Sequence, residues 1–243
     1  IAKAAVKKEV ANLVLISSDK AVRPTNIMGA TKRISELYLQ ALNHEDKNNL
    51  TNFSIVRFGN VLESSGSVIP KFKKQIKDGG PITLTHKDVT RYFMTITEAA
   101  QLVIQAGALG ENSEVFVLDM GDSIKIKDLI EKMIIFSGLT IKNSKNQKGD
   151  IEIKIIGLRP GEKLYEELLV GNDPQKTTHP KILMAKDPFI PFADLESYLK
   201  NLNKLLNENN LKEVKNLIEK LITSYNSNSK IVDHIYIEKL KKI

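Results

Sequence analysis

The chain has 243 residues, of which 42% are hydrophobic, and it carries a formal net charge of +7. That length and apolar content are enough to bury a substantial core, so we expect one large domain, alone or with an appendage. The sequence has no cysteine, which excludes disulfides and thiolate metal sites. No apolar run approaches the roughly 20 residues of a membrane helix. The basic residues are spread out without a nucleic-acid-binding module, so we expect no nucleic acid partner.

Strand and helix patterns alternate along most of the chain. Short apolar runs bounded by turn residues predict strands at residues 12–17, 53–58, 82–84, 115–118 and 152–156. Longer segments with few breakers predict helices at residues 1–10, 26–42, 67–77, 97–106 and 126–137. The polar residues 142–150 predict a loop. This alternation predicts an α/β fold with a parallel sheet, in which residues 13–16 form a fully buried strand.

The pattern changes from Asp194 onward. Leucines at helical spacing predict two amphipathic helices, joined near residues 207–210. We therefore expect residues 1–190 to form the main part of the fold and residues 191–243 to form a helical appendage. The apolar faces of these helices either fold back on their own domain, which is the simpler expectation, or contact another subunit or domain.

A polar cluster follows the first predicted strand. Ser17, Ser18, Asp19 and Lys20 stand where this strand should emerge from the sheet, and ligands of open α/β folds bind at that edge. Met28 and Lys32 follow on the predicted helix at residues 26–42. They lie four residues apart, so they share one face of that helix. We interpret the cluster as an active site. The alternative is a surface turn in which Asp19 caps a backbone amide and Lys20 is solvated.

Residues 18–33 resemble the large, membrane-anchored UDP-N-acetylglucosamine 4,6-dehydratases of bacterial polysaccharide and glycan biosynthesis, within the extended short-chain dehydrogenase/reductase superfamily. Helices of that superfamily carry Tyr-x-x-x-Lys, and methionine commonly occupies the tyrosine position in this branch, as Met28 does here. The resemblance runs from the first residue to about Asp187. Further blocks that carry it are residues 57–61, 64–70, 90–94, 157–163 and 179–182.

The resemblance implies a Rossmann-like parallel sheet that binds NAD, with NADP left open. The superfamily seats the dinucleotide pyrophosphate on a Gly-x-Gly-x-x-Gly turn, and this sequence contains none. We therefore expect the chain to be the C-terminal portion of a longer enzyme whose N-terminal half is absent here. By resemblance, the parent protein is anchored to the inner membrane with this part in the cytoplasm, binds a UDP-sugar and forms homo-oligomers.

The resemblance also implies roles for the residues of the cluster. Asp19 acts as the acid and Lys20 as the base, because dehydration needs two adjacent groups with opposite proton duties. Ser18 orients the C-4 hydroxyl of the sugar, and Lys32 holds the nicotinamide ribose. A thioether cannot exchange a proton, so Met28 cannot take the proton of that hydroxyl. Either Asp19 or a water accepts it.

Binding residues are implied in the same way. Helix-start amides and arginine side chains suit phosphate oxygens, whereas Glu162 could bind a ribose hydroxyl or only orient Arg159. The implied cofactor-binding residues are Ser17, Lys32, Arg57 and Gly59. The implied substrate-binding residues are Asn60, Ser67, Val68, Arg91, Arg159 and Glu162. The four histidines show no metal-ligand spacing, and we expect no metal site.

Two rival interpretations stay open. One is a sister enzyme, either a dehydratase that inverts C-5 or a 4-epimerase, although Met28 argues against most epimerases. The other is a truncated sugar-nucleotide-binding module without turnover. The sequence does not decide the hexosamine, the C-5 stereochemistry or the oligomeric state.

Overall fold

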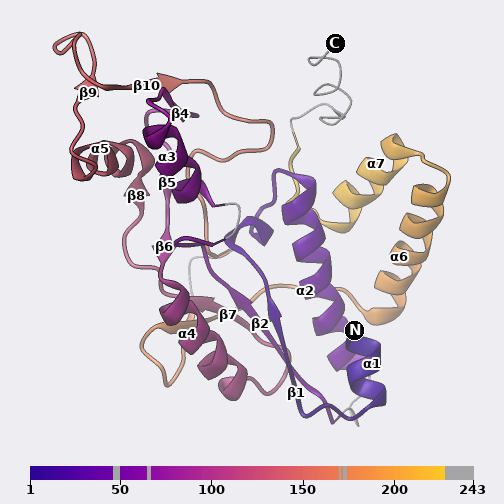
Figure 1. The fold of residues 1–243 in the computed structure, drawn as a ribbon. Helices are drawn as coiled ribbons and strands as arrows, with labels where there is room; N and C mark the ends of the chain where they lie inside the picture. The colour runs from indigo at the N-terminus through magenta and orange to yellow at the C-terminus, as the bar shows by residue number, and fades with distance from the viewer. Residues whose placement is uncertain (46–49, 65–66, 170, 172–173, 228–243) are drawn as a thin grey trace.

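The computed structural model describes residues 1–45, 50–64, 67–169, 171 and 174–227. Ser65 and Gly66 of the block at residues 64–70, and residues 228–243 of the expected appendage, lie outside the described residues. The described chain has an α/β architecture, with one five-stranded sheet, a smaller three-stranded sheet and a pair of C-terminal helices (Figure 1).

The five-stranded sheet has the order β1-β2-β7-β12-β11. Its first three strands, β1 (Asn12–Ile16), β2 (Asn52–Arg57) and β7 (Val115–Leu118), are parallel. β12 (Ile182–Ala185) and β11 (Gln175–Lys176) add an antiparallel edge. The expected α/β fold with a parallel sheet is therefore confirmed, and the antiparallel edge is a feature that the sequence patterns missed.

Helices cover both faces of this sheet. On one face, Phe53 and Ile55 of β2 belong to a core cluster with α1 (Ala2–Lys7) and α2 (Ile27–Glu45). On the other face, Val56 packs in a cluster with α4 (Ile96–Leu109). Neighbouring residues of β2 thus face opposite sides, as strand geometry requires, and both sides are apolar.

The strand β1 differs from the prediction. Asn12 and Ile16 are exposed and the three residues between them are only partly buried, although a fully buried strand was expected. The reason is its position, because β1 is the edge of the sheet and pairs with β2 alone among the described strands. Residues 1–10 also form a shorter helix than expected, since α1 ends at Lys7.

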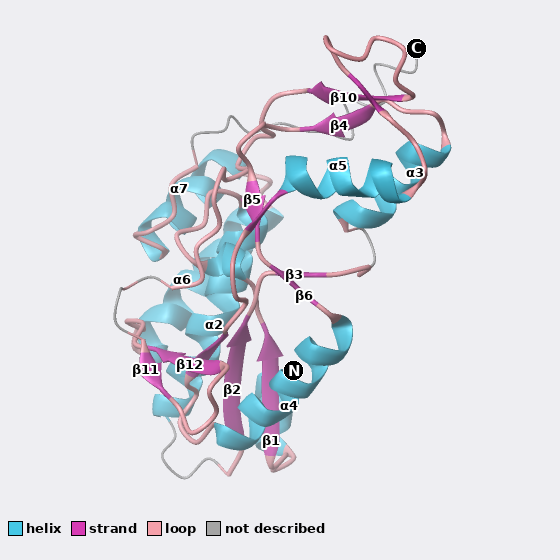
Figure 2. Cartoon of the chain, turned by 90° about the vertical axis from the view of Figure 1, so that its left-hand side faces the viewer, coloured by secondary structure: helices cyan, strands magenta, loops and turns pink. Residues whose placement is uncertain are grey.

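The smaller sheet lies beyond the carboxyl ends of β1 and β2 (Figure 2). It consists of the parallel strands β4 (Ile82–Leu84), β10 (Ile151–Ile155) and β9 (Ile141–Lys142). A separate core cluster joins it to α3 (Val68–Lys77) and α5 (Ile126–Phe136). Two-residue strands connect the two parts of the molecule: β3 (Asn60–Val61) pairs with β6 (Phe93–Met94), and β5 (Thr90–Arg91) pairs with β8 (Ile124–Lys125).

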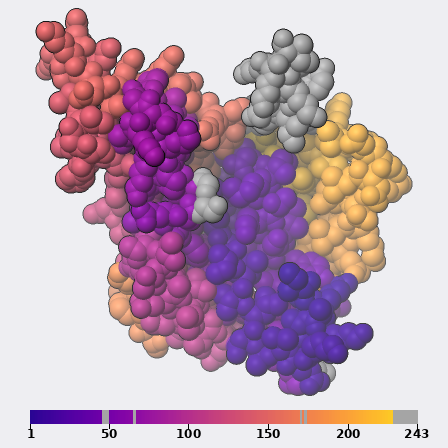
Figure 3. Space-filling view, in the orientation of Figure 1, coloured from indigo at the N-terminus to yellow at the C-terminus, as the bar shows by residue number. Residues whose placement is uncertain are grey.

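The C-terminal helices α6 (Phe192–Asn207) and α7 (Leu211–Leu221) pack against α2. Leu195 of α6 and Ile218 of α7 share a core cluster with Leu37 of α2, and the helices lie directly against the surface of α2 (Figure 3). The expectation that their apolar faces fold back on the same chain is confirmed. The division at residue 190 into a main part and an appendage stays a prediction.

No helix in the described ranges is both long and apolar enough to cross a membrane.

A buried ion-pair network ties the carboxyl ends of the sheet to α2. Glu36, in the middle of α2, accepts hydrogen bonds from Arg57 Nε at 2.8 Å, from Arg33 Nη1 at 2.9 Å and from Ser17 Oγ at 2.5 Å. Asp187, which follows β12, accepts a further bond from Arg57 Nη2 at 2.6 Å. The network thus joins the carboxyl ends of β1 and β2 to α2 and to the segment that follows the antiparallel strand β12.

We predict that Glu36→Gln lowers the free energy of unfolding at neutral pH by about 3–5 kcal/mol, because the buried cations Arg33 and Arg57 would then share the single carboxylate of Asp187. Denaturant unfolding measures the change. Glu196→Gln is the control, since Glu196 pairs with Lys3 and Lys200 on the surface and should contribute little.

The contribution of Glu36 should also depend on pH. Burial alone would raise the pKa of Glu36, but the hydrogen bonds and charge of Arg57 outweigh burial and hold the pKa below its ordinary value. Such a carboxyl stabilises the fold above its unfolded pKa, and this contribution is lost as the pH falls through the folded pKa. The difference between wild type and Glu36→Gln should therefore shrink below about pH 4. A difference that persists at lower pH would contradict an ionised Glu36.

Candidate active site

The turn after β1 holds a carboxyl and an amine in contact. η1 (Asp19–Ala21) is a single 3-10 turn, and Ser18 caps it because its Oγ accepts the Lys20 amide at 3.2 Å. Ser18 Oγ also donates to Asp19 Oδ1 at 2.8 Å, and Lys20 Nζ lies 2.9 Å from the same oxygen. The Asp19 side chain is fully buried. The alternative of a capping aspartate beside a solvated lysine is therefore wrong.

Helix α2 packs directly onto this turn. Asn26 Oδ1 accepts the Gly29 amide at 2.9 Å and so caps the start of α2. A Cβ on Gly29 would lie 2.2 Å from the carbonyl oxygen of Lys20, so only glycine permits this approach. About one turn later, Lys32 Nζ donates to the carbonyl of Ile16 at 3.1 Å. Its ammonium therefore sits at the carboxyl end of β1, as expected, while the Met28 side chain is half exposed.

All the residues that the resemblance implied for substrate binding line one cleft of about 530 Å³, to which β3 and the β4 strand of the smaller sheet contribute. Lys20 and Gly59 line the same cleft. Ser17, Ser18, Asp19, Met28, Lys32 and Arg57 are not part of its lining.

The structure contradicts the cofactor-binding role that was implied for the side chains of two residues, Ser17 and Arg57. Ser17 and Arg57 are buried, and their polar atoms bond to Glu36 instead of facing the cleft. The Arg57 guanidinium is held inside the protein by the carboxylates of Glu36 and Asp187, and so it is turned away from the cleft. We assign both side chains to the ion-pair network that holds the strand ends.

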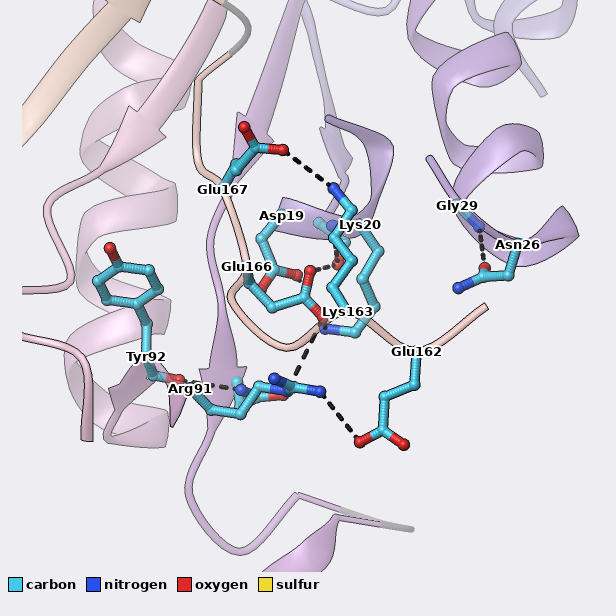
Figure 4. A network of polar contacts seen from close by, with 12 residues as sticks. Asp19, Lys20, Asn26, Gly29, Arg91, Tyr92, Glu162, Lys163, Glu166 and Glu167 are labelled. Atoms are coloured by element: carbon cyan, nitrogen blue, oxygen red, sulfur yellow. Dashed lines mark hydrogen bonds and ion pairs between the residues drawn. The ribbon is translucent and has the colours of Figure 1, made fainter. Parts of the chain in front are cut away.

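Glu162 organises the arginines of the cleft. Its Oε1 accepts Arg91 Nη2 at 3.1 Å and Thr85 Oγ1 at 2.9 Å, and its Oε2 accepts the Arg159 amide at 3.1 Å. Of the two roles left open for Glu162, these contacts favour orientation of the arginines. Figure 4 shows Arg91 and Glu162 in contact on the side of the site away from Glu167.

The loop that carries Arg159 and Glu162 is tied to the start of α2. The carbonyl of Gly161 accepts Thr25 Oγ1 at 2.7 Å and Asn26 Nδ2 at 3.1 Å, and Lys163 Nζ donates to the carbonyl of Val22 at 2.8 Å. Two motifs that are more than a hundred residues apart in the sequence therefore form one rigid wall.

The start of α3 and the strand before it form the opposite wall. Ser67 precedes α3, and its buried Oγ has no hydrogen-bond partner among the described residues. Val68 begins the helix, so its amide is one of those that intrahelical bonds leave free. Asn60 lines the cleft but uses its amide nitrogen to bond the carbonyl of Tyr92 at 3.0 Å.

The sequence patterns missed two charged residues of the site. Lys71 lines the cleft from α3, and burial together with the charge of Arg159 lowers its pKa. The helical spacing from Val68 to Lys71 could have indicated it. Glu166 is buried beside Lys20 and Arg91, with distances of 3.9 and 3.8 Å from its Oε1 to Lys20 Nζ and Arg91 Nε. No sequence signal distinguishes it from Glu167, because only the fold shows which one turns inward.

The described residues contain no group of three histidine, aspartate or glutamate side chains that could hold a metal ion.

We predict that Gly29→Ala destabilises the protein by about 1–3 kcal/mol, because the added methyl group overlaps backbone that cannot rotate away. Thermal unfolding measures the loss. Ser35→Ala on the exposed face of the same helix is the control and should leave the midpoint unchanged. Equal midpoints for wild type and Gly29→Ala would show that α2 does not pack on the Lys20 carbonyl.

Known proteins match most of this chain. The family described as "Polysaccharide biosynthesis protein" matches residues 1–187. The capsular polysaccharide biosynthesis protein CapD of Staphylococcus aureus is 56% identical over 173 residues, which are 71% of this chain and 27% of that protein. A UDP-glucose 4-epimerase of Rickettsia canadensis is 37% identical over 173 residues, which are 71% of this chain and 48% of the epimerase.

A solved structure supports the same relationship. Pen from Bacillus thuringiensis superposes with a TM-score of 0.64 at 34% identity, and the match covers 82% of this chain and 65% of that one. The chain spans less than a third of the length of the Staphylococcus protein and about half that of the epimerase. From its sequence over residues 1–187 and its Rossmann-like fold, the chain belongs to the polysaccharide biosynthesis protein family.

Proposed function

We propose that this chain carries the catalytic and sugar-nucleotide-binding residues of an NAD-dependent enzyme that converts UDP-N-acetylglucosamine to a UDP-4-keto-6-deoxy-hexosamine. The observation that carries the proposal is the contact of 2.9 Å between Lys20 Nζ and Asp19 Oδ1, with Asp19 buried and Lys20 lining the cleft. Because the chain spans only part of its relatives, the activity belongs to the whole protein that contains it.

The pair of Asp19 and Lys20 can supply both proton transfers. Once C-4 is oxidised, the C-5 proton is acidic, so Lys20 takes it while Asp19 protonates the hydroxyl that leaves C-6 as water. In the ion pair, the proton is on Lys20. Its transfer along the existing contact breaks an N–H bond, forms an O–H bond on Asp19, and leaves the amine and the carboxylic acid that the reaction needs.

When bound, NAD would supply the hydride chemistry, by taking hydride from C-4 and giving it back at C-6, and the protonated Lys20 amine then returns a proton to C-5. The described residues fit one end of the cofactor. The Lys32 ammonium stands at the carboxyl end of β1, where it bonds to the carbonyl of Ile16, and the half-exposed Met28 lies one turn before it on α2. Lys32 would bind the ribose next to the nicotinamide. The residues that hold the pyrophosphate and choose between NAD and NADP are proposed to lie outside this chain.

The charges of the cleft favour an anionic substrate. Lys71, Arg91 and Arg159 line it, and Glu162 is the acidic residue of the same lining. Burial lowers the pKa of Lys71, the charge of Arg159 lowers it further, and the charge of Glu162 only partly opposes these effects. Lys71 and Arg159 therefore lie close enough to repel one another. A diphosphate placed between them would relieve this repulsion.

A 4-epimerase is the second candidate, favoured by the 37% identity to a UDP-glucose 4-epimerase. The dehydratase is preferred because Met28 cannot exchange a proton with the C-4 hydroxyl. A C-5-inverting dehydratase, or a binding module without turnover, would use the same cleft. Homo-oligomers and the inner-membrane anchoring of a longer parent protein stay predictions.

Turnover in deuterated water tests the proposal. The full-length protein that contains this chain should convert UDP-N-acetylglucosamine to a 4-keto-6-deoxy product when NAD is supplied. NMR of this product should show deuterium at C-5. Lys20→Met and Asp19→Asn should each lower kcat by about 10²–10⁴-fold, which is the usual contribution of a positioned acid or base. Lys77→Met, an exposed lysine at the end of α3, is the control. A C-4 epimer without a keto product would favour the epimerase, and binding without turnover would favour the module.

Calorimetry of UDP binding tests the role of Lys71. Lys71→Met should weaken binding by about tenfold, or about 1.4 kcal/mol. Because a bound diphosphate would raise the lowered pKa of Lys71, binding by wild type at alkaline pH should also take up protons, and the variant should not. Lys74→Met is the matched control, since Lys74 lies three residues further along α3 and pairs with Asp78. Equal affinity and equal proton uptake in wild type and Lys71→Met would remove Lys71 from the site.

A further inference from the structure

Glu166 is a buried carboxyl of the site that the proposed reaction does not use. Only 8% of the residue is exposed. Its Oε1 lies 3.9 Å from Lys20 Nζ and 3.8 Å from Arg91 Nε, so one oxygen faces both the proposed base and a substrate-binding arginine. Its Oε2 is buried without a hydrogen-bond partner among the described residues. Figure 4 shows Glu166 between Asp19 and Arg91.

The charged groups around Glu166 come from three segments. Asp19 and Lys20 face it from η1, Arg91 faces it from β5, and Lys163 faces it from the segment that precedes it. Burial raises the pKa of Glu166, the three cations oppose this effect, and the charge of Asp19 adds to it. The Lys20 amine therefore has two carboxyl neighbours, Asp19 at 2.9 Å and Glu166 at 3.9 Å.

A second observation links these two carboxyls. Asp19 Oδ2, like Glu166 Oε2, is buried and accepts no hydrogen bond from the described part of the chain. Both carboxyls lie against the Lys20 amine, since Asp19 Oδ1 and Glu166 Oε1 each face Lys20 Nζ, and negative charges beside an ammonium favour its protonated form. The strength with which Lys20 keeps its proton must then depend on Glu166 as well as on Asp19.

We propose that Glu166 is a positioning residue of this site, which sets how strongly the Lys20 amine holds its proton and keeps the Arg91 guanidinium beside that amine. The catalytic meaning of this inference rests on the proposed function. The coupling of Glu166 to Lys20 does not rest on the proposed function, because the proton affinity of Lys20 can be measured without cofactor, substrate or turnover.

The test follows the protonation of Lys20 in the 243-residue chain. Only a neutral amine reacts with acetic anhydride, so the extent of Lys20 labelling, read by peptide mass spectrometry between about pH 7 and 11, reports its titration. Glu166→Gln removes the charge at nearly constant shape. It should move the labelling curve of Lys20 to lower pH by about one unit, which is about tenfold faster labelling on the rising limb.

Glu167→Gln is the matched control. Glu167 carries the same side chain one residue later, but it is more exposed and pairs with Arg23 and Lys163. It should leave the curve of Lys20 in place. An unchanged curve in Glu166→Gln, or an equal shift in both variants, would overturn the inference whether or not the whole protein turns over its substrate. If the whole protein shows no turnover but Glu166→Gln shifts the labelling curve of Lys20 as expected, only the proposed function is contradicted.

A reciprocal measurement covers the case in which Glu166→Gln does not fold. In wild type labelled with ¹³C at glutamate carboxyls, the Glu166 signal gives its own titration midpoint. Lys20→Met removes a cation that favours ionised Glu166, so the midpoint should rise in that variant. A midpoint that does not change would contradict the coupling between Lys20 and Glu166.

Discussion

Glu36 is the residue on which the geometry of this molecule depends. It sits in the middle of α2, yet its carboxylate is bonded to Ser17 at the end of β1 and to Arg57 at the end of β2, and Arg57 in turn holds Asp187 after β12. A buried charge is tolerated only when its partners are fixed, so each element must keep its position for the others to be satisfied. The residues next in the chain, Ser18 to Lys20, are therefore presented at the sheet edge in one arrangement.

The site adds a second constraint of a different kind. Gly29 lets α2 touch the Lys20 carbonyl, and Gly161 lets the loop of Arg159 touch the start of α2. Both contacts involve backbone atoms, which leave little room for adjustment. Packing thus brings together the pair of Asp19 and Lys20 from one end of the sequence and the loop of Arg159 from another, and Glu166 lies between Lys20 and Arg91.

Much of the fold could be predicted because local patterns and tertiary packing agree. β4 and β7 have the predicted bounds, α2 lies where the lack of helix breakers indicated, and the C-terminal helices lie where their leucine spacing indicated. The short strands β3, β5, β6 and β8 could not be predicted, since two residues hold no periodicity and become strands only through partners far away in the sequence. The exposure of β1 had the same cause, because an apolar run does not reveal how many neighbours the strand will have.

By itself the sequence determined the α/β class, the order of the motifs, and the juxtaposition of Asp19 with Lys20, because these depend on residues close together in the chain. Only the tertiary structure decided that Arg57 points into the protein, that Glu162 pairs with the Arg91 guanidinium, and that Glu166 turns inward while Glu167 turns out. The physical reason is that the role of a charged side chain depends on burial and on its partners. Both of these are properties of the folded chain, and neither can be read from the residue type or from its neighbours in sequence.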